Sequence, residues 1–459
     1  MNYESWIPSL RERRGMLDAM GVADWRELYS DVPPGLMLPE PPRVGAGRPL
    51  TEYEARRLVE REFRDVAVFR DPPPFMGGGL CYHVVPSVVE AVAGRAEFYT
   101  AYTPYQPEIN QGLLQALFEY QSLVADLLEM DVVNASMYDM STAVAEAFLM
   151  AVRVTRRRRI IVPATMHPEH RETAETWLMG KGIELIQAPY NPETGEADIG
   201  FIEEKLREGG VAAVYMEQPS SLGFIDPGVE AAAEAAHRHG ALFILGFEPL
   251  SLGILRPPGR LGADIAVGEG QPLGLGLNYG GPLLGIMAVR GERRLIRQMP
   301  GRIVGMTRSV EGERGFTLIL QAREQHIRRE KATSNITTNE ALMAVRAAAY
   351  LALLGGEGLR RLAESIWLRS HYAARRLRSL GVEAPVFKAE FFKEFTARFP
   401  IPYREVHAKL LEKRILGGLP LSRWGRSCRE ALFCVTEAHS RSDIDRLVDA
   451  VAEALGGAG

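Results

Sequence analysis

The sequence predicts an α/β protein with a mostly parallel sheet, followed by a smaller α+β domain. Apolar runs rich in β-branched residues alternate with helical stretches, which is typical of βαβ units. Strands that are spaced by helices in this way indicate a mostly parallel sheet. We expect strands at residues 159–163, 182–188, 211–217, 241–247, 263–268 and 283–289.

The first part of the chain has a different character. Proline clusters at residues 33–34, 39–42 and 72–74 separate short helical patterns, such as the one at 51–63. We therefore expect residues 1–85 to form an N-terminal arm, wrapped over a large α/β domain that spans residues 86–330.

The last part of the chain predicts the smaller domain. Between residues 341 and 380 apolar residues recur with helical spacing, and Gly355-Gly356 divides the pattern into two helices. A strand at 431–435 and an amphipathic helix at 442–455 follow. Residues 331–459 are thus expected to form a small C-terminal α+β domain.

Composition excludes several classes of protein. The 459 residues are 46% hydrophobic and 24% charged, so the chain can build sizeable cores and is not disordered. The net charge of −4 draws the protein neither to nucleic acid nor to an anionic membrane. Arg346 interrupts the longest apolar run, and the start of the chain has no signal-peptide pattern. We expect a cytoplasmic protein without membrane spans.

Neither a disulfide framework nor a metal site is expected. The three cysteines, Cys81, Cys428 and Cys434, are odd in number and lack metal-ligand spacing, which favours a reducing compartment. His167 and His170 could share a zinc ion, but a third ligand is not evident, and the start of a helix explains them more simply.

Two further segments have unusual composition. Gly268 to Gly274 reads GEGQPLG, whose GxGxxxG spacing does not match a dinucleotide-binding turn. The segment 97–112 reads EFYTAYTPYQPEINQG and combines three tyrosines with two prolines. Tyrosines offer flat apolar faces and a hydroxyl, so this loop is expected either to line a site or to be a rigid structural connection.

The chain resembles the P-protein family of the glycine cleavage system, and within it the α subunits, which correspond to the N-terminal half. The resemblance rests on EFYTAYTPYQPEINQG at 97–112, NASMYDMST at 134–142, ADIAVGEGQPLGLGLNYGG at 263–281, REQHIRREKATSNIT at 323–337 and VTEAH at 435–439. It implies the fold-type I architecture of pyridoxal-phosphate enzymes, with an aspartate aminotransferase-like, seven-stranded, mostly parallel sheet. It also implies decarboxylation of glycine and transfer of its aminomethyl group to the lipoyl arm of the H-protein.

A pyridoxal-phosphate enzyme holds its cofactor on a lysine, and the resemblance shows none at the expected place. Aligned with the family's catalytic half, Gln271 falls at the lysine position, and an amide cannot form the imine. None of the seven lysines lies between residues 206 and 330: they are Lys181, Lys205, Lys331, Lys388, Lys393, Lys409 and Lys413.

Neighbouring positions also depart from a catalytic subunit. Glu248 stands where an aspartate usually pairs with the pyridine nitrogen, and Pro249 follows it. Met140 replaces a glycine in the equivalent of the phosphate loop, residues 136–142. The segment Cys81-Tyr82-His83 occupies a position at which the family more often has Tyr-Asp-His.

The resemblance therefore implies a subunit that depends on a homologous β subunit. Pyridoxal phosphate is expected on β, in an (αβ)2 assembly whose active site lies at the α/β interface and which acts on glycine and lipoylated H-protein. This chain would contribute Tyr99, Tyr102, Tyr105, Thr333, Ser334 and Asn335. Two alternatives stay open: a self-sufficient enzyme that uses Lys331, and a non-enzymatic scaffold that docks the H-protein or stabilises β.

Overall fold

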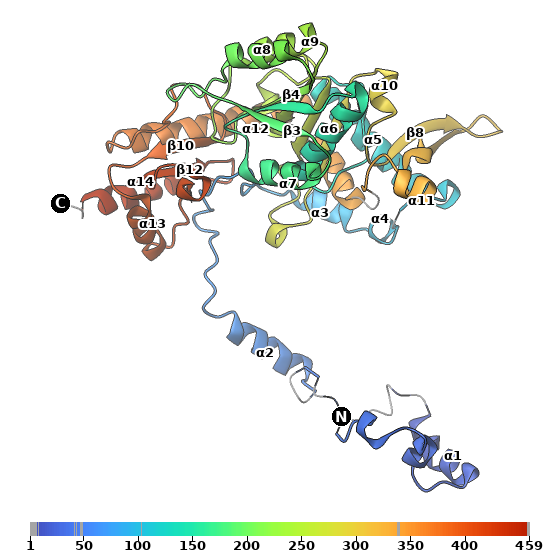
Figure 1. Ribbon diagram of the computed structural model, residues 1–459. Coiled ribbons are helices and arrows are strands. Elements are labelled where there is room, and N and C mark those ends of the chain that lie inside the picture. Colours follow the sequence, from blue (N-terminus) through green and yellow to red (C-terminus); the bar gives the residue numbers. More distant parts are fainter. Residues whose placement is uncertain are drawn as a thin grey trace. The chain divides into compact units, whose positions relative to one another are not determined.

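The computed structural model describes residues 7, 9–40, 42, 44–45, 49–101, 103–336 and 340–456 (Figure 1). The chain divides into two compact units, Met1–Val68 and Phe69–Gly459. The first unit contains the α-helices α1 (Arg13–Met20) and α2 (Glu52–Glu62) and the 3-10 helices η2 (Leu10–Glu12), η3 (Trp25–Tyr29) and η4 (Pro34–Leu36). Helix α2 begins at a capping box formed by Thr51 and Glu54, as the pattern at 51–63 predicts.

A seven-stranded sheet forms the centre of the second unit, with strand order β1-β7-β6-β5-β4-β2-β3. Strands β3, β2, β4, β5 and β6 are parallel, while β7 is antiparallel to β6 and β1 is antiparallel to β7. The strands are β1 (Val132–Val133), β2 (Arg159–Pro163), β3 (Glu184–Ala188), β4 (Val211–Gln218), β5 (Leu242–Phe247), β6 (Ile265–Glu269) and β7 (Gly285–Val289). The prediction of a mostly parallel α/β sheet is confirmed.

Helices cover both faces of this sheet, which is why its strands are apolar without alternation (Figure 1). In β4, Ala213 and Tyr215 pack with α6 and α7, whereas Val214 and Met216 pack with α8 and α9. Helices α5 and α12 cover the β7 end of that second face. The covering helices are α5 (Gln111–Leu128), α6 (Met140–Thr155), α7 (Pro168–Leu178), α8 (Ile199–Glu208), α9 (Val229–Arg238) and α12 (Ala341–Arg378).

Helix α12 connects the sheet to the C-terminal part of the chain. Gly355, at φ 59° and ψ −178°, interrupts its helical geometry, as the Gly355-Gly356 pair predicts. Among the described residues, α12 alone has the length and composition of a membrane span, but 44% of its most apolar window is buried inside the protein. Because its apolar residues pack in the cores, α12 serves here as a core helix.

The C-terminal part contains a three-stranded antiparallel sheet, with order β10-β12-β11. Its strands are β10 (Glu394–Arg398), β11 (Leu419–Pro420) and β12 (Glu430–Cys434). Helices α13 (Tyr403–Glu412) and α14 (Arg441–Gly456) and the end of α12 enclose a separate apolar core against it. The strand and the terminal helix predicted here are confirmed.

The remaining elements lie in the connections of the second unit. A hairpin of β8 (Ile303–Arg308) and β9 (Arg314–Ile319) was not predicted, and it packs on α5. The short helices are α3 (Ser87–Ala93), α4 (Ala96–Tyr99), α10 (Arg293–Ile296), α11 (Gln325–Arg328), η5 (Pro107–Ile109), η6 (Pro249–Gly253), η7 (Asn278–Gly280), η8 (Gln321–Arg323), η9 (Arg329–Lys331) and η10 (Leu421–Trp424).

The expectation about cysteines is wrong. Cys81 and Cys434 form a disulfide across 353 residues and join the segment before α3 to strand β12. Cys428 is free and exposed. Sequence spacing gave no sign of the pair, because the two cysteines meet only through the tertiary fold. Glu394 lies beside them, and with the sulfurs bonded to each other this group offers no thiolate to a metal.

Candidate functional site

A small cavity of about 70 Å³ lies beside the carboxyl ends of β4, β5 and β6. Ligands of open α/β sheets bind at this edge. Met140, the first residue of α6, contributes to the wall, as do three acids: Glu217, the last but one residue of β4, Glu248, which follows β5, and Glu269, which ends β6. We call this hollow the inner cavity.

Glu269 accepts three backbone hydrogen bonds at one end of the inner cavity. One oxygen accepts from the N–H groups of Gln271 and Leu284, both at 3.0 Å, and the other accepts from the N–H of Met140 at 3.2 Å. Burial raises the pKa of Glu269 to about 8, although the three donors act in the opposite direction. The carboxyl group therefore satisfies a free N–H at the start of α6.

Glu248, which follows the neighbouring strand β5, belongs to a largely buried polar chain. Its carboxylate lies 2.8 Å from Lys393 Nζ and also accepts from Ser251 N–H. Lys393 Nζ lies 3.2 Å from His83 Nε2, and His83 Nδ1 lies 3.0 Å from Glu437. His83, within the unusual Cys-Tyr-His segment, is thus a link between two carboxylates.

The two histidines considered as metal ligands meet at Glu217. His170 Nδ1 lies 2.9 Å from Glu217, which also accepts hydrogen bonds from the Tyr215 hydroxyl and the His167 N–H. Burial alone would raise the pKa of Glu217, but His170 and these donors hold it below its usual value. His167 caps the start of α7, which confirms the simpler interpretation.

Gln271 is fully buried just after β6. Its side-chain N–H group donates to the carbonyls of Cys81 and Gly276, both at 3.1 Å, so backbone contacts hold the amide in place. Its Oε1 has no hydrogen-bond partner among the described residues.

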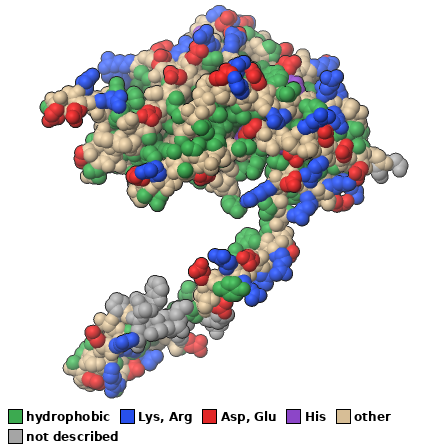
Figure 2. All heavy atoms as spheres, turned by 180° about the vertical axis from the view of Figure 1, so that it is seen from behind, with side chains coloured by type: hydrophobic (Ala, Val, Ile, Leu, Met, Phe, Trp, Pro, Cys, Tyr) green, Lys and Arg blue, Asp and Glu red, His purple; other side chains and the backbone are tan. Residues whose placement is uncertain are grey.

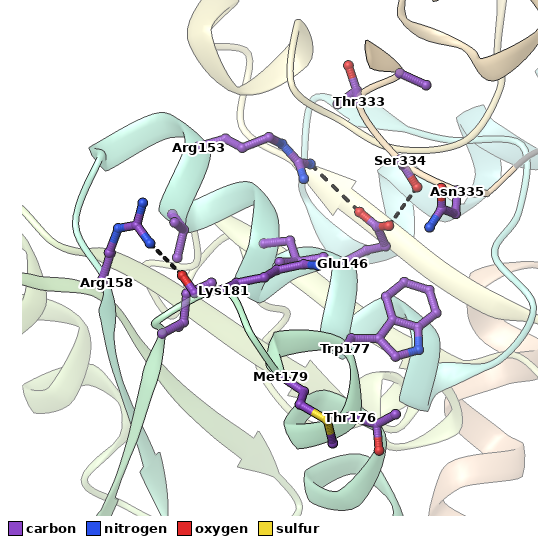
Figure 3. A pocket seen from close by; sticks show the side chains of 14 residues that line it. Glu146, Arg153, Arg158, Thr176, Trp177, Met179, Lys181, Thr333, Ser334 and Asn335 are labelled. Carbon is purple, nitrogen blue, oxygen red and sulfur yellow. Dashed lines mark hydrogen bonds and ion pairs between the residues drawn. The ribbon is translucent and has the colours of Figure 1, made fainter. Parts of the chain in front are cut away.

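A larger pocket of about 560 Å³ lies between α6, α7 and the segment 332–335 (Figure 3). We call it the outer pocket. Thr333, Ser334 and Asn335 line it, opposite Trp177 of α7. Ser334 Oγ donates to Glu146 at 2.6 Å, and Arg153 lies 3.7 Å from the other oxygen of that carboxyl.

The polar groups of the outer pocket are incompletely satisfied. Glu146 Oε2 and Arg153 Nε are buried and have no hydrogen-bond partner in the described part of the chain. Burial raises the pKa of Glu146 and lowers that of Arg153, although each group acts on the other in the opposite direction. Buried polar groups in complete structures normally have hydrogen-bond partners. Unpaired atoms of this kind are expected in a pocket that another molecule completes.

Tyr105 of the tyrosine segment (residues 97–112) contacts Arg302 and α11, the helix that precedes the segment 332–335 in the chain. Tyr105 OH accepts a hydrogen bond from Arg302, and its ring lies 4.9 Å from that of His326 in α11. Arg302 and Glu324 are buried 3.5 Å apart, and each retains atoms without a hydrogen-bond partner in the residues that the structure describes. Tyr99, at the end of α4, is 58% exposed, and Tyr102 lies outside the described residues.

The predicted site residues thus fall into two groups. Thr333 to Asn335 share the outer pocket, and Tyr105 touches α11, a few residues before them. The sequence interpretation missed Glu146, Arg153, Arg302 and Glu269. Glu269 stands in the glycine-rich GEGQPLG segment, where a charged residue ending an apolar strand was the available signal.

The chain has the fold of the fold-type I pyridoxal-phosphate enzymes. One solved neighbour is a sphingosine-1-phosphate lyase of Burkholderia pseudomallei, with a TM-score of 0.65 and 17% identity over 92% of this chain and 93% of that chain. At this identity the likeness concerns the fold alone. A crystal structure of glycine decarboxylase (P-protein) of the glycine cleavage system, in inhibitor-bound form, gives a TM-score of 0.83 and 41% identity over 97% and 98% of the two chains.

Sequence comparison identifies the family. The family model of the glycine cleavage system P-protein matches residues 4–451, so the chain belongs to that family. A probable glycine dehydrogenase (decarboxylating) subunit 1 from Aeropyrum pernix is 57% identical over 98% of this chain and 99% of its own length. A protein of the same description from Sulfolobus acidocaldarius is 51% identical over 99% and 100%.

The residues of the inner cavity do not fit pyridoxal phosphate. Gln271 offers no amine, Lys393 already pairs with Glu248, and Glu269 takes the N–H group at the start of α6. The cavity is also well below the roughly 300 Å³ at which small-molecule pockets begin.

Proposed function

We propose that this chain is the α subunit of a cytoplasmic glycine decarboxylase. With a homologous β subunit it decarboxylates glycine and passes the aminomethyl group to the lipoyl arm of the H-protein. Membership of the P-protein family and similarity to subunits named subunit 1 support this assignment. The observation that carries the division of labour is Gln271, a fixed amide beside a cavity too small for the cofactor.

Pyridoxal phosphate on β would supply the electron sink for decarboxylation. This chain would supply side chains to the shared site: Tyr99, Tyr102, Tyr105, Thr333, Ser334 and Asn335. The outer pocket supports this role, because its buried polar atoms lack partners within the described chain. Lys331 is exposed in η9 and lines neither the inner cavity nor the outer pocket, which disfavours a self-sufficient enzyme.

An apolar surface supports a stable α/β contact. Hydrophobic side chains gather on the face of the second unit shown in Figure 2. Exposed large hydrophobic residues recur in three segments, 84–109, 277–279 and 306–327. Exposed apolar surface marks protein contacts where it gathers, and we propose that β covers these segments in an (αβ)2 heterotetramer, with an interface above about 2,000 Å².

Reconstitution with β tests the assignment. Alone, the chain should show no internal-aldimine absorbance with pyridoxal phosphate, no stoichiometric lysine adduct after borohydride reduction, and no glycine decarboxylation. Mixed with β, it should sediment as a heterotetramer and restore activity with lipoylated H-protein. Activity without β, accompanied by a stoichiometric adduct on Lys331 or another lysine, would refute the proposal.

Tyrosine variants separate an active-site role from that of a scaffold. Tyr105→Phe removes the hydroxyl that accepts from Arg302 and changes little volume. If that hydroxyl serves the shared site, glycine turnover should fall at least about tenfold, or about 1.4 kcal/mol, with normal assembly. Tyr99→Phe and Tyr102→Phe complete the series. Normal turnover in all three variants would assign the loop to structure and the subunit to a scaffolding role.

A further inference from the structure

The start of α6 is the part of this fold suited to a phosphate group. The segment 136–142 corresponds to the phosphate loop by resemblance, and α6 begins within it, at Met140. A helix start presents unpaired N–H groups and the positive end of the helix dipole, which together bind anions. In this chain the N–H of Met140 donates to a side chain of the protein itself, Glu269.

We propose that Glu269 is a built-in substitute for the cofactor phosphate, so that its carboxyl oxygens close the inner cavity to pyridoxal phosphate and to free phosphate. The carboxyl joins three separate segments, because it accepts from Met140 at the start of α6, from Gln271 after β6 and from Leu284 before β7. Two oxygens meet three N–H donors, so a further anion has no free donor among these three.

Packing around the carboxyl supports closure. A Cβ placed on Gly246 of β5 would lie 2.7 Å from the Tyr215 hydroxyl and 2.9 Å from Met140 Cε. The Met140 side chain therefore fills space against β5 that a glycine at this position in the loop would leave open. Asp139, which caps α6 through Thr142, adds a second acid close to Glu269 and further disfavours an entering phosphate.

The neighbouring acid of the cavity wall is also occupied. Glu248, the counterpart of the acid that would pair with a pyridine nitrogen, is paired with the ammonium of Lys393, which is 2% exposed. Both acids that a pyridoxal phosphate would meet in this cavity thus already have partners in the chain. This inference depends on the fold and not on the proposed reaction.

Thermal unfolding of the full chain, without β or glycine, tests the substitution. The probe is inorganic phosphate, raised to about 100 mM at constant ionic strength, a concentration range suited to a weak anion site. The wild-type midpoint should not respond. Glu269→Ala leaves three N–H groups without an acceptor, so its midpoint should fall by at least about 3 °C, and phosphate should restore about half of that loss.

Two further variants make the result specific. Glu269→Gln keeps the volume and one acceptor oxygen, so it should show a smaller loss and no response to phosphate. Glu172→Ala on the exposed side of α7 is the control and should match the wild type with and without phosphate.

Three results would overturn the proposal. One is a saturable phosphate response in the wild type or in Glu269→Gln, which decides the matter even if Glu269→Ala does not fold. Another is a folded Glu269→Ala variant whose unfolding midpoint is lowered but does not respond to phosphate. A Glu269→Ala midpoint equal to that of the wild type would count in the same way. The third is equilibrium dialysis that places one pyridoxal phosphate on each wild-type chain, in competition with phosphate. Because β is absent, these outcomes leave the proposed reaction untouched.

Discussion

The two hollows beside α6 differ in how their polar groups are satisfied. In the inner cavity, Glu217, Glu248 and Glu269 each have donors from the same chain; beside it, the buried Gln271 Oε1 has no partner among the described residues. In the outer pocket, Glu146 and Arg153 keep buried atoms that have no partner in the part of the chain that the structure describes. The inner cavity measures about 70 Å³ and the outer pocket about 560 Å³.

This difference is what the two proposals require: an inner cavity that the chain closes by itself and an outer pocket that a partner completes. Buried polar groups that are paired internally stabilise the subunit by itself, whereas unpaired ones carry a cost that a bound group can remove. Mutations in the inner cavity should therefore affect folding most, and mutations in the outer pocket should affect the assembled enzyme most.

The largest expected effect is at the inner cavity. Lys393→Met leaves Glu248 buried without its cation, and breaking such a pair costs about 3–5 kcal/mol of unfolding free energy. Urea unfolding followed by tryptophan fluorescence measures this loss. Lys388→Met breaks an exposed pair with Glu193 and should cost less than about 1 kcal/mol. Equal losses of unfolding free energy in the two variants would contradict the expectation that the Lys393–Glu248 pair contributes more than the exposed Lys388–Glu193 pair.

The disulfide is next in magnitude. It lies beside the inner cavity, since the Cys81 carbonyl accepts from Gln271. Reduction, or Cys434→Ser, should lower the unfolding free energy by about 2–4 kcal/mol, because the bond restricts a long loop in the unfolded chain. Cys428→Ser at the exposed cysteine is the control. An unchanged midpoint in reductant, with the Cys81–Cys434 bond shown by mass mapping in its absence, would contradict this expectation.

A pH dependence should distinguish Glu269 from its neighbours. Its pKa is about 8 in the folded chain and near 4.5 when unfolded, so the folded state binds the extra proton between these values. Stability should accordingly fall as pH rises from 5 to 8, with a contribution of up to about 1.4 kcal/mol per pH unit. Glu269→Gln should lack this contribution. The same slope in variant and wild type would assign it to other groups.

The smallest effect is expected in the outer pocket. Ser334→Ala removes the donor to Glu146 Oε1, but solvent can reach this pocket, so the loss should be about 1 kcal/mol. Thr333→Val, which removes a hydroxyl from the same wall, should be nearly neutral. With β present, Ser334→Ala should instead lower glycine turnover at normal assembly. If Ser334→Ala lost as much unfolding free energy as Lys393→Met, the outer pocket would also stabilise the fold of the chain.

The sequence predicted the sheet well because burial on two faces leaves long apolar runs. All six predicted strands are present, while β1 escaped notice because it has two residues. The β8–β9 hairpin escaped because its burial is uneven and its strands end in exposed residues. These elements owe their pairing to tertiary contacts more than to local pattern.

The polar sites were less predictable for a related reason. Ser334 and Glu146 are 188 residues apart, and Lys393 and Glu248 are 145 residues apart. The position of the sequence motif indicated Thr333 to Asn335 as site residues. The acid that they face, Glu146, could be identified only from the fold. Glu269 was missed because its glycine-rich segment was tested only against a dinucleotide-binding turn, which its spacing does not match, and nothing in the sequence showed that its carboxyl would meet the start of α6.

The Glu269 carboxyl at the start of α6 also has a consequence for how the stability of the subunit depends on the supply of cofactor. A protein held together by a diffusible ligand gains stability with the logarithm of that ligand's concentration. Glu269 is covalently part of the chain, so its contribution is the same at any level of the vitamin-derived cofactor. If Glu269 replaces the cofactor phosphate as proposed, the folding of this chain should not depend on the cofactor concentration.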